Sequence, residues 1–324
     1  MKILFLSDNF IPETNAPASR TYEHAREWVK KGADVTVITT VPNFPKGKVY
    51  EGYKNKIYQK EHIDGIEVIR VISFIAKNEG FILRILDFIS FMITSFIASL
   101  FQKKIDVIIA TSPQFFTALA GFFVSRFKRI PWVFEVRDLW PDTIAGVGFL
   151  KDGLIFKLLK RIEYFLYKKA DAIIVVTNGF KEILGNNGVD TKKISVVMNG
   201  VDLTKFKYKD KPPNLEEKYN LKGKKVLGYI GTHGETQGLQ TILLSAAKLK
   251  EMKNIIFLFI GQGSRKKELI EFKENNKLDN VIFLDNVPRN EIIDYWALID
   301  ISLIILKKRE VFRTVIPSKI FESI

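Results

Sequence analysis

Residues 226–263 read VLGYIGTHGETQGLQTILLSAAKLKEMKNIIFLFIGQG. The run Val226–Ile230 is short and apolar, which is typical of a buried strand. The pattern after it predicts a helix over Leu239–Lys250 and a second buried strand over Ile255–Ile260. A strand, a helix and a strand in this order form a right-handed crossover between parallel strands. This stretch therefore predicts a parallel sheet covered by helices.

The same alternation runs through the rest of the chain. Further strands are expected at Ile3–Leu6, Val35–Thr39, Ile66–Val71, Val107–Ala110, Trp132–Val136, Ala172–Val176, Ile194–Val197, Val281–Leu284 and Ile301–Leu306. Further helices are expected at Tyr22–Lys30, Phe115–Phe127, Leu154–Lys169, Lys266–Asn275 and Glu291–Leu298. The polar stretch Lys207–Asn214, with two prolines, predicts a linker. We therefore expect an α/β protein with Rossmann-like domains over residues 1–206 and 207–324, the second with only four strands.

Composition narrows the class of protein. The length of 324 residues favours two domains, at about 150 residues per domain. The chain has no cysteine, which excludes disulfides, thiolate catalysis and Cys-based zinc sites. The net charge of +14 suits an anionic partner, such as a phosphorylated molecule or an acidic membrane surface. Nucleic acid is disfavoured because the basic residues are scattered rather than gathered on a recognisable binding module.

The segment Phe81–Phe101 is apolar apart from Arg84, Asp87 and a few hydroxyl groups. About 20 apolar residues suffice to span a bilayer, but Arg84 and Asp87 could pair on one helix face. Three alternatives remain: a crossover helix in the core, an interfacial helix dipping into a membrane, or a transmembrane span. The chain reaches Ser7 and Asp8 too soon for the apolar core of a signal peptide.

Ligands of such sheets bind beyond the carboxyl ends of the strands. Five loops follow predicted strands or open helices there: residues 7–20, 137–142, 231–238, 261–264 and 316–319. None carries the Gly-x-Gly-x-x-Gly fingerprint of a dinucleotide site, so an NAD enzyme is disfavoured. No Asp-x-Asp run is present to hold a metal on a diphosphate, so backbone amides, Lys and Arg must neutralise such a ligand. No cofactor and no metal are expected.

Several runs in these loops resemble a known family. They are Phe10-Ile11-Pro12-Glu13, Val41-Pro42-Asn43-Phe44-Pro45-Lys46-Gly47, Asp64-Gly65-Ile66-Glu67-Val68, Ser112-Pro113, Glu135-Val136-Arg137-Asp138-Leu139-Trp140-Pro141-Asp142, Asn199-Gly200-Val201-Asp202, Gly261-Gln262-Gly263, Val287-Pro288 and Ile316-Pro317-Ser318-Lys319-Ile320-Phe321-Glu322. Together they resemble the retaining, GT-B-fold glycosyltransferases of the family-4 type. The likeness is to the subgroup that adds amino-deoxy sugars to lipid-linked O-antigen or capsule intermediates.

The resemblance implies two Rossmann-like domains facing across a cleft. The first would bind the acceptor, and the second would bind the nucleotide-sugar donor. Family members continue past the Glu322 motif with a further strand and helix, so we expect a C-terminally truncated second domain. The expected partners are a UDP-sugar, a lipid-linked saccharide and the anionic inner face of the cell membrane. The expected location is cytoplasmic, peripheral on that face of the membrane. An inactive or scaffold GT-B fragment is the alternative.

The resemblance also assigns candidate residues. Glu322 matches the second glutamate of the family's Glu-x7-Glu motif, which holds the ribose, while the first falls at Thr314. The family's phosphate-binding Arg and Lys fall at Thr232 and Gln237, so Lys319 is the expected replacement. Arg137 aligns with the family's active-site histidine, and Arg137, Asp138 and Lys319 are the expected catalytic residues. The other expected substrate contacts are Asn15, Gly231, Thr232, His233, Gly261, Gly263, Val287, Ser318 and Glu322.

Each assignment has a structural alternative. Arg137 and Asp138 could form a local ion pair, and Lys319 could be a solvated helix end. His233 could be a hydrogen-bonded loop histidine, and Glu322 could stabilise the first turn of its helix. Transfer with retention could use two displacements through a carboxylate, or front-face attack through an oxocarbenium-like transition state. The resemblance implies front-face attack. The leaving diphosphate oxygen would then help to take the acceptor proton.

Overall fold

A computed structural model describes residues 1–324 except 76–80, 113–114, 147, 149–152, 289 and 324. The chain divides into two compact units, Met1–Met198 and Asn199–Ile324. The first unit thus ends at Met198, a few residues before the expected boundary after residue 206. The expected boundary coincides with the start of the polar stretch Lys207–Asn214. Of the family-like runs, Pro113 lies outside the described residues.

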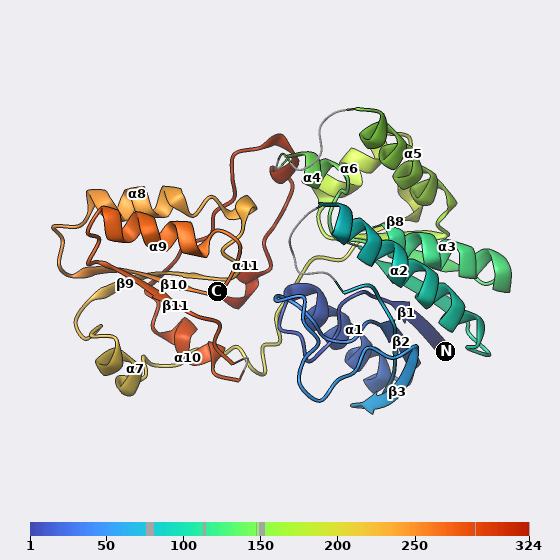
Figure 1. Ribbon diagram of the computed structural model, residues 1–324, viewed down its shortest axis with the longest axis horizontal. Coiled ribbons are helices and arrows are strands. Elements are labelled where there is room, and N and C mark those ends of the chain that lie inside the picture. Colours follow the sequence, from blue (N-terminus) through green and yellow to red (C-terminus); the bar gives the residue numbers. More distant parts are fainter. Residues whose placement is uncertain (76–80, 113–114, 147, 149–152, 289, 324) are drawn as a thin grey trace. The chain divides into compact units, whose positions relative to one another are not determined.

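The first unit is built on a mostly parallel sheet (Figure 1). Its strands have the spatial order β3-β4-β2-β1-β5-β6-β7-β8 among the described residues. In chain order they are β1 (Lys2–Leu6), β2 (Asp34–Thr39), β3 (Tyr58–Ile63), β4 (Ile66–Val71), β5 (Val107–Thr111), β6 (Trp132–Val136), β7 (Ala172–Val175) and β8 (Ile194–Val196). The strand β3 was missed because its alternating burial on an edge gives no apolar run. It pairs antiparallel with β4, so the sheet is mixed rather than wholly parallel.

Helices cover both faces of this sheet. The helix α1 (Ala16–Lys30) packs against Phe5, Val37 and Val68 on one face. On the other face, α3 (Phe116–Lys128) lies so close to the strands that a Cβ at Gly121 would come within 2.7 Å of the Ala110 Cβ. The remaining helices are α2 (Phe81–Leu100), α4 (Asp142–Gly146), α5 (Leu154–Lys169) and α6 (Asn178–Asn186). The predicted helix Leu154–Lys169 is confirmed to the residue.

The helix α1 begins six residues before the expected start at Tyr22. The Asn15 side chain caps it by accepting a hydrogen bond from the Ala18 N–H at 2.8 Å. Pro17 lies in the first turn, where its fixed φ suits a helix and its missing N–H costs nothing. The loop after β1 therefore covers residues 7–15 rather than 7–20, and Arg20 and His24 lie on a helix.

The second unit contains a parallel sheet with the order β11-β10-β9-β12 among the described residues. Its elements are α7 (Pro213–Lys218), β9 (Lys225–Ile230), α8 (Gln240–Lys248), β10 (Ile255–Ile260), α9 (Lys266–Asn275), β11 (Val281–Leu284), α10 (Ile292–Ala297), β12 (Ile301–Ser302) and α11 (Lys319–Glu322). Figure 1 shows α8 and α9 on one face and α7 and α10 on the other. The strand β12 is shorter than the predicted Ile301–Leu306, and α7 begins inside the predicted linker.

The apolar helix α2 connects β4 to β5, as a crossover helix would. Its Phe91, Ser95 and Ala98 are buried, while Ile93 and Ile97 are each 48% exposed. By length and composition alone, its segment Leu83–Leu100 is apolar enough to cross a membrane, with mean hydropathy 1.7 and 22% of it buried. One such helix is weak evidence for a span, because core helices of soluble proteins pass the same test.

Candidate active site

The loop after β1 is tied to neighbouring loops by two buried charged side chains. The Glu13 carboxylate accepts hydrogen bonds from the backbone N–H groups of Asn43 (2.8 Å) and Phe44 (2.9 Å). The Arg70 guanidinium, on β4, donates to the carbonyl of Ile11 at 2.6 Å. Neither Glu13 nor Arg70 was assigned a role from the sequence, because their partners lie far away along the chain.

Asn15, an expected substrate contact, has two structural partners. Its side-chain oxygen caps α1, and its Nδ2 donates to Glu13 Oε2 at 3.4 Å. These bonds account for the residue without a ligand. Its place in the loop after β1 still lies at the carboxyl edge of the sheet.

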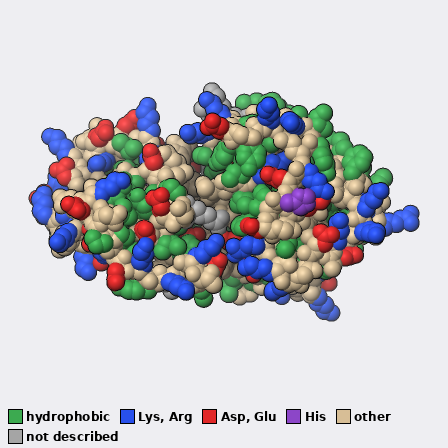
Figure 2. Space-filling model, turned by 90° about the horizontal axis from the view of Figure 1, so that it is seen from below, with side chains coloured by type: hydrophobic (Ala, Val, Ile, Leu, Met, Phe, Trp, Pro, Cys, Tyr) green, Lys and Arg blue, Asp and Glu red, His purple; other side chains and the backbone are tan. Residues whose placement is uncertain are grey.

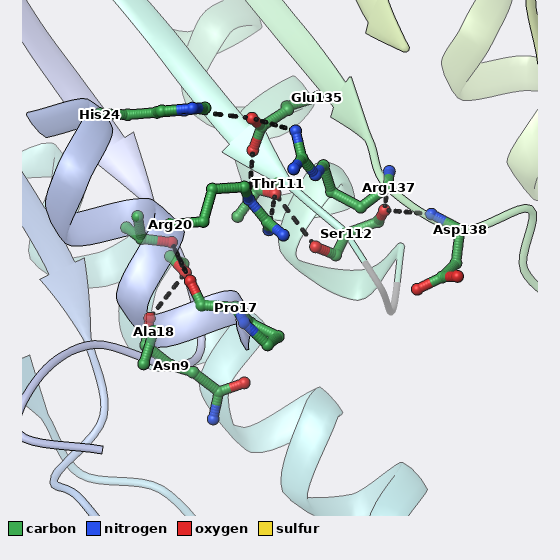
Figure 3. A network of polar contacts seen from close by, with 12 residues as sticks. Asn9, Pro17, Ala18, Arg20, His24, Thr111, Ser112, Glu135, Arg137 and Asp138 are labelled. Carbon is green, nitrogen blue, oxygen red and sulfur yellow. Dashed lines mark hydrogen bonds and ion pairs between the residues drawn. The ribbon is translucent and has the colours of Figure 1, made fainter. Parts of the chain in front are cut away.

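Three basic side chains surround one buried carboxylate at the end of β6 (Figure 3). Glu135 Oε1 lies 3.3 Å from Arg137 Nη1 and 3.5 Å from His24 Nδ1. Arg20 Nε lies 3.9 Å from Glu135 Oε2. Arg20 and His24 are four residues apart on α1, so they project from one face of that helix. Burial alone would raise the pKa of Glu135, but Arg20, His24 and Arg137 hold it well below its usual range.

Asp138 follows this cluster and is held by its backbone. The Ser112 hydroxyl, at the end of β5, accepts from the N–H groups of Arg137 (2.7 Å) and Asp138 (3.4 Å). Within the described residues, no hydrogen bond or ion pair joins the Asp138 carboxylate, so the structure does not form the local ion pair with Arg137 that was the alternative to a catalytic role. Burial raises the pKa of Asp138 to about 6, although Arg20 and Arg137 lower it. The arrangement leaves a titratable carboxylate available at the carboxyl edge of the sheet.

In the second unit, glycines bring the ends of β9 and β10 into close contact. Gly231 and Gly261 have φ values of +143° and +146°, which L side chains rarely adopt. A Cβ at Gly261 would lie 2.0 Å from the Gly231 carbonyl oxygen, and one at Gly263 would lie 2.3 Å from the His233 carbonyl oxygen. These positions therefore require glycine, because neighbouring protein atoms already fill the space that a Cβ would take.

Lys319, at the start of α11, reaches the same place. Its ammonium lies 3.8 Å from the centroid of the Tyr229 ring, and a Cβ at Gly231 would come within 2.6 Å of Nζ. Burial lowers the pKa of Lys319 to about 8, and Glu322 partly offsets this effect. The cation is therefore partly desolvated beside the Gly231–Gly261 contact and is not the solvated helix end that the sequence allowed. Such a cation suits an anionic ligand such as a diphosphate.

Other cations near this loop are already engaged. Glu235 forms ion pairs with Lys307 and, at 3.2 Å, with Arg265. The Lys266 ammonium donates to the carbonyls of Gly261 and Leu284, both at 2.8 Å. Lys319 also lies beside Gly231. Unlike Lys307, Arg265 and Lys266, it forms no hydrogen bond or ion pair with a carboxylate or carbonyl group within the described residues.

His233 is fully buried among aromatic rings. Neither of its ring nitrogens has a hydrogen-bond partner within the part of the chain that the structure describes. Burial, with Lys266 and Lys319 nearby, lowers the pKa of His233 to about 4. The expectation of a hydrogen-bonded loop histidine is therefore wrong, and the ring is neutral at pH 7.

The remaining candidates divide into two groups. Thr232 is exposed, and its carbonyl accepts from the Tyr229 hydroxyl at 2.8 Å, so it lies beside Gly231 as expected. Val287 instead packs against the apolar cluster that includes Tyr295 and Leu298, which is a structural role. Ser318 makes no capping bond with its side chain, and α11 has only four residues, so the dipole of this helix adds little to anion binding at Ser318. Glu322 lies at the end of α11, one turn after Lys319.

These features define a class of protein. Two Rossmann-like sheets, with candidate binding residues at the carboxyl ends of their strands, make a GT-B glycosyltransferase fold, and solved glycosyltransferases share it over most of the chain. Sucrose-phosphate synthase from Thermosynechococcus elongatus matches with a TM-score of 0.70 and 13% identity, covering 94% of this chain and 75% of that one. WaaG, a glycosyltransferase of lipopolysaccharide biosynthesis, matches with a TM-score of 0.62 and 14% identity, covering 94% and 75%.

The chain belongs to glycosyltransferase family 4, whose family model matches residues 18–205. The model of the glycosyl transferases group 1 matches residues 211–316. The putative colanic acid biosynthesis glycosyl transferase WcaI of Escherichia coli is 26% identical over 99% of this chain and 80% of its own length. The probable glycosyltransferase WbjE of Pseudomonas aeruginosa is 26% identical over a match that covers 59% of this chain and 48% of that relative. The chain is thus a glycosyltransferase, and the name of one of its relatives refers to polysaccharide biosynthesis.

Proposed function

We propose that this protein transfers a sugar from a UDP-sugar to a lipid-linked saccharide during synthesis of a cell-surface polysaccharide. The names of two relatives support the pathway class, since they refer to colanic acid and teichuronic acid biosynthesis. The donor class is supported by HepE from Anabaena, solved with UDP-glucose, which shares the fold with a TM-score of 0.63 at 16% identity and covers 93% of this chain and 73% of its own. The subgroup that uses amino-deoxy sugars for O-antigen or capsule is part of the proposal.

The observation that carries the donor site is the position of Lys319. A partly desolvated ammonium lies beside Gly231 and the Tyr229 ring, at the carboxyl ends of parallel strands where ligands of such sheets bind. A diphosphate there would gain a charge-assisted bond from Lys319 and would restore the charge that burial disfavours. In our proposal Lys319 neutralises the leaving diphosphate without a metal, and Glu322 holds the ribose.

The proposed reaction retains the configuration of the sugar. The bond between the sugar's anomeric carbon and the diphosphate oxygen breaks, and the acceptor oxygen attacks from the same face. The acceptor proton passes to the leaving diphosphate oxygen, so the products are the lengthened saccharide and UDP. Asp138 accepts a hydrogen bond from the attacking hydroxyl, and Arg137 stabilises charge near it. A carboxylate with a pKa of about 6 is ionised at pH 7 and suits this role.

We also propose that the first unit works on the inner face of the cell membrane as a peripheral protein. Exposed apolar side chains on three helices support this: Ile93 and Ile97 on α2, Phe123 and Phe127 on α3, and Leu154, Ile155 and Leu158 on α5. We call these residues the apolar surface. Figure 2 shows hydrophobic side chains gathered on the molecule's surface with Lys and Arg side chains beside them. A surface of this kind suits the interface of an anionic bilayer.

The function is tested by measuring nucleotide binding and then transfer. A thermal-shift screen of UDP-, GDP-, ADP- and CDP-sugars should show stabilisation by uridine nucleotides, because a ligand that binds the folded state raises its stability. The stabilised donor is then offered with a short-chain lipid diphosphate saccharide, and product is detected by mass spectrometry with and without EDTA. Binding without transfer would favour the scaffold alternative. Loss of transfer in EDTA would contradict metal independence.

A further inference from the structure

The proposed chemistry uses Asp138 and Arg137 but gives no role to the buried carboxylate of Glu135. Glu135 is 2% exposed, so it is poorly placed to touch a substrate itself. Its two oxygens are nevertheless directed at three basic side chains from two elements, Arg20 and His24 on α1 and Arg137 after β6. A buried carboxylate is costly unless it is paired, so this cluster has a structural or functional reason.

Two carboxylates, Glu135 and Asp138, belong to this end of β6, and only Glu135 forms ion pairs within the described residues. Glu135 binds the basic groups, whereas the Asp138 carboxylate has no ion pair within the described residues. Arg137 lies between them in the chain, and Figure 3 shows its guanidinium directed back toward Glu135 while the Asp138 carboxylate points away. The charged groups that act on Asp138 are Arg20, from α1, and Arg137, from its own strand end.

We infer that Glu135 is a positioning residue that binds Arg20 and Arg137 and so keeps the Asp138 carboxylate unpaired for the acceptor hydroxyl. The inference rests on the proposed function and adds a residue that does not touch the substrate. The Ser112 hydroxyl supports the same arrangement, because it holds the N–H groups of Arg137 and Asp138 in place. The basic residues thus stay near the reacting groups without neutralising Asp138.

The physical consequence of removing Glu135 follows directly. Arg20 and Arg137 would lose the Glu135 carboxylate as a partner, and Asp138 is a second carboxylate on which both guanidinium groups already act. An arginine–carboxylate pair typically lowers the pKa of the acid by about one to three units. The Asp138 carboxylate would then be held by arginine and unable to orient a substrate hydroxyl.

The experiment is a pH titration of the aspartate side chains by carbon NMR in the full chain, without ligands. The Asp138 signal is assigned with Asp138→Asn. We expect a midpoint at about 6 in the wild type and at about 5 or lower in Glu135→Gln. Glu27→Gln, an exposed change on α1, is the matched control and should leave the midpoint at its wild-type value. An unchanged or higher midpoint in Glu135→Gln would overturn the inference.

A loosened loop would also lower this midpoint by exposing Asp138, so a second variant separates the two causes. The double change Glu135→Gln with Arg20→Gln removes a freed guanidinium together with its partner. Because Arg20 already lowers the pKa of Asp138 in the wild type, the double variant is compared with Arg20→Gln alone. If freed arginine causes the shift, Glu135→Gln lowers the midpoint less in the Arg20→Gln background than in the wild type; an equal drop in both backgrounds contradicts the inference. These outcomes are independent of the reaction, whereas an active Asp138→Asn variant would contradict the proposed role of Asp138 itself.

Discussion

The Lys319 ammonium lies 3.8 Å from the centroid of the Tyr229 ring. A cation over an aromatic face is stabilised more weakly than one in a carboxylate pair, and it loses part of its hydration. Lys319 is therefore available to bind a second, stronger anionic partner. The position of Lys319 beside Gly231 lies at the carboxyl ends of β9 and β10, where we propose that the diphosphate binds.

We expect Lys319→Ala to weaken binding of UDP far more than binding of uridine, because only the diphosphate carries the charge that Lys319 meets. A loss of about 1.5–3 kcal/mol corresponds to at least a tenfold weaker UDP complex. Calorimetry with both ligands measures the difference. Lys253→Ala, an exposed change in the same unit, is the control. Equal weakening of both ligands would make Lys319 a structural residue.

Glu322→Ala should weaken the binding of UDP and uridine alike, unlike Lys319→Ala. If its carboxylate binds the ribose hydroxyls, UDP and uridine lose the same contact and weaken by the same factor, equivalent to about 1.5–3 kcal/mol. The same calorimetric experiment checks this expectation. Affinities equal to those of the wild type would remove Glu322 from the donor site.

The affinity for UDP should fall as the pH rises through 8. In the free protein the Lys319 pKa is lowered to about 8 by burial, so the charged form is lost above that pH. A bound diphosphate favours the charged form, and UDP binding at pH 8 therefore takes up a proton. Proton uptake is measured by calorimetry in buffers of different ionisation enthalpy. Lys319→Arg keeps its charge at this pH and should bind UDP without the uptake; uptake that persists in this variant would come from another group.

The protein should sediment with vesicles that contain anionic lipid, be partly released by high salt, and bind neutral vesicles weakly. The double change Ile93→Ser with Ile97→Ser, on the apolar surface, should reduce this binding because it removes buried apolar area. Leu244→Ser, at a residue 50% exposed on α8 of the other unit, is the control. Full recovery in the supernatant at low salt would refute membrane docking, and resistance to salt and alkali would indicate a span.

Gly261→Ala should destabilise the second unit by more than about 2 kcal/mol, since it combines a strained φ with overlap on the Gly231 carbonyl. Gly223 also has a positive φ, +72°, but a Cβ there meets nothing within 4 Å. Gly223→Ala should therefore cost only about 1 kcal/mol. Denaturant unfolding of the two variants compares the costs, and similar values would show that the Gly261 backbone can move away.

Local patterns predicted much of the architecture. The strand Trp132–Val136 and the helix Leu154–Lys169 have their predicted bounds, because their apolar periodicity is strong and their ends are clear. The edge strand β3 was missed, since half of its side chains face solvent and its partner was unknown. The start of α1 was misplaced because the Asn15 cap and Pro17 were interpreted as loop residues. That error hid Arg20 and His24 as neighbours on one helix face.

The sequence by itself determined the α/β class, the two sheets and the loops at their carboxyl ends, because these depend on periodicity and on glycine and proline at fixed places. Only the tertiary structure decided which charges meet. It turned Arg137 toward Glu135 rather than Asp138, buried His233 without hydrogen bonds, and placed Lys319 beside Gly231, 88 positions earlier in the chain. The physical reason is that ionic pairing and burial depend on distances between residues far apart in sequence, and no local pattern encodes those distances.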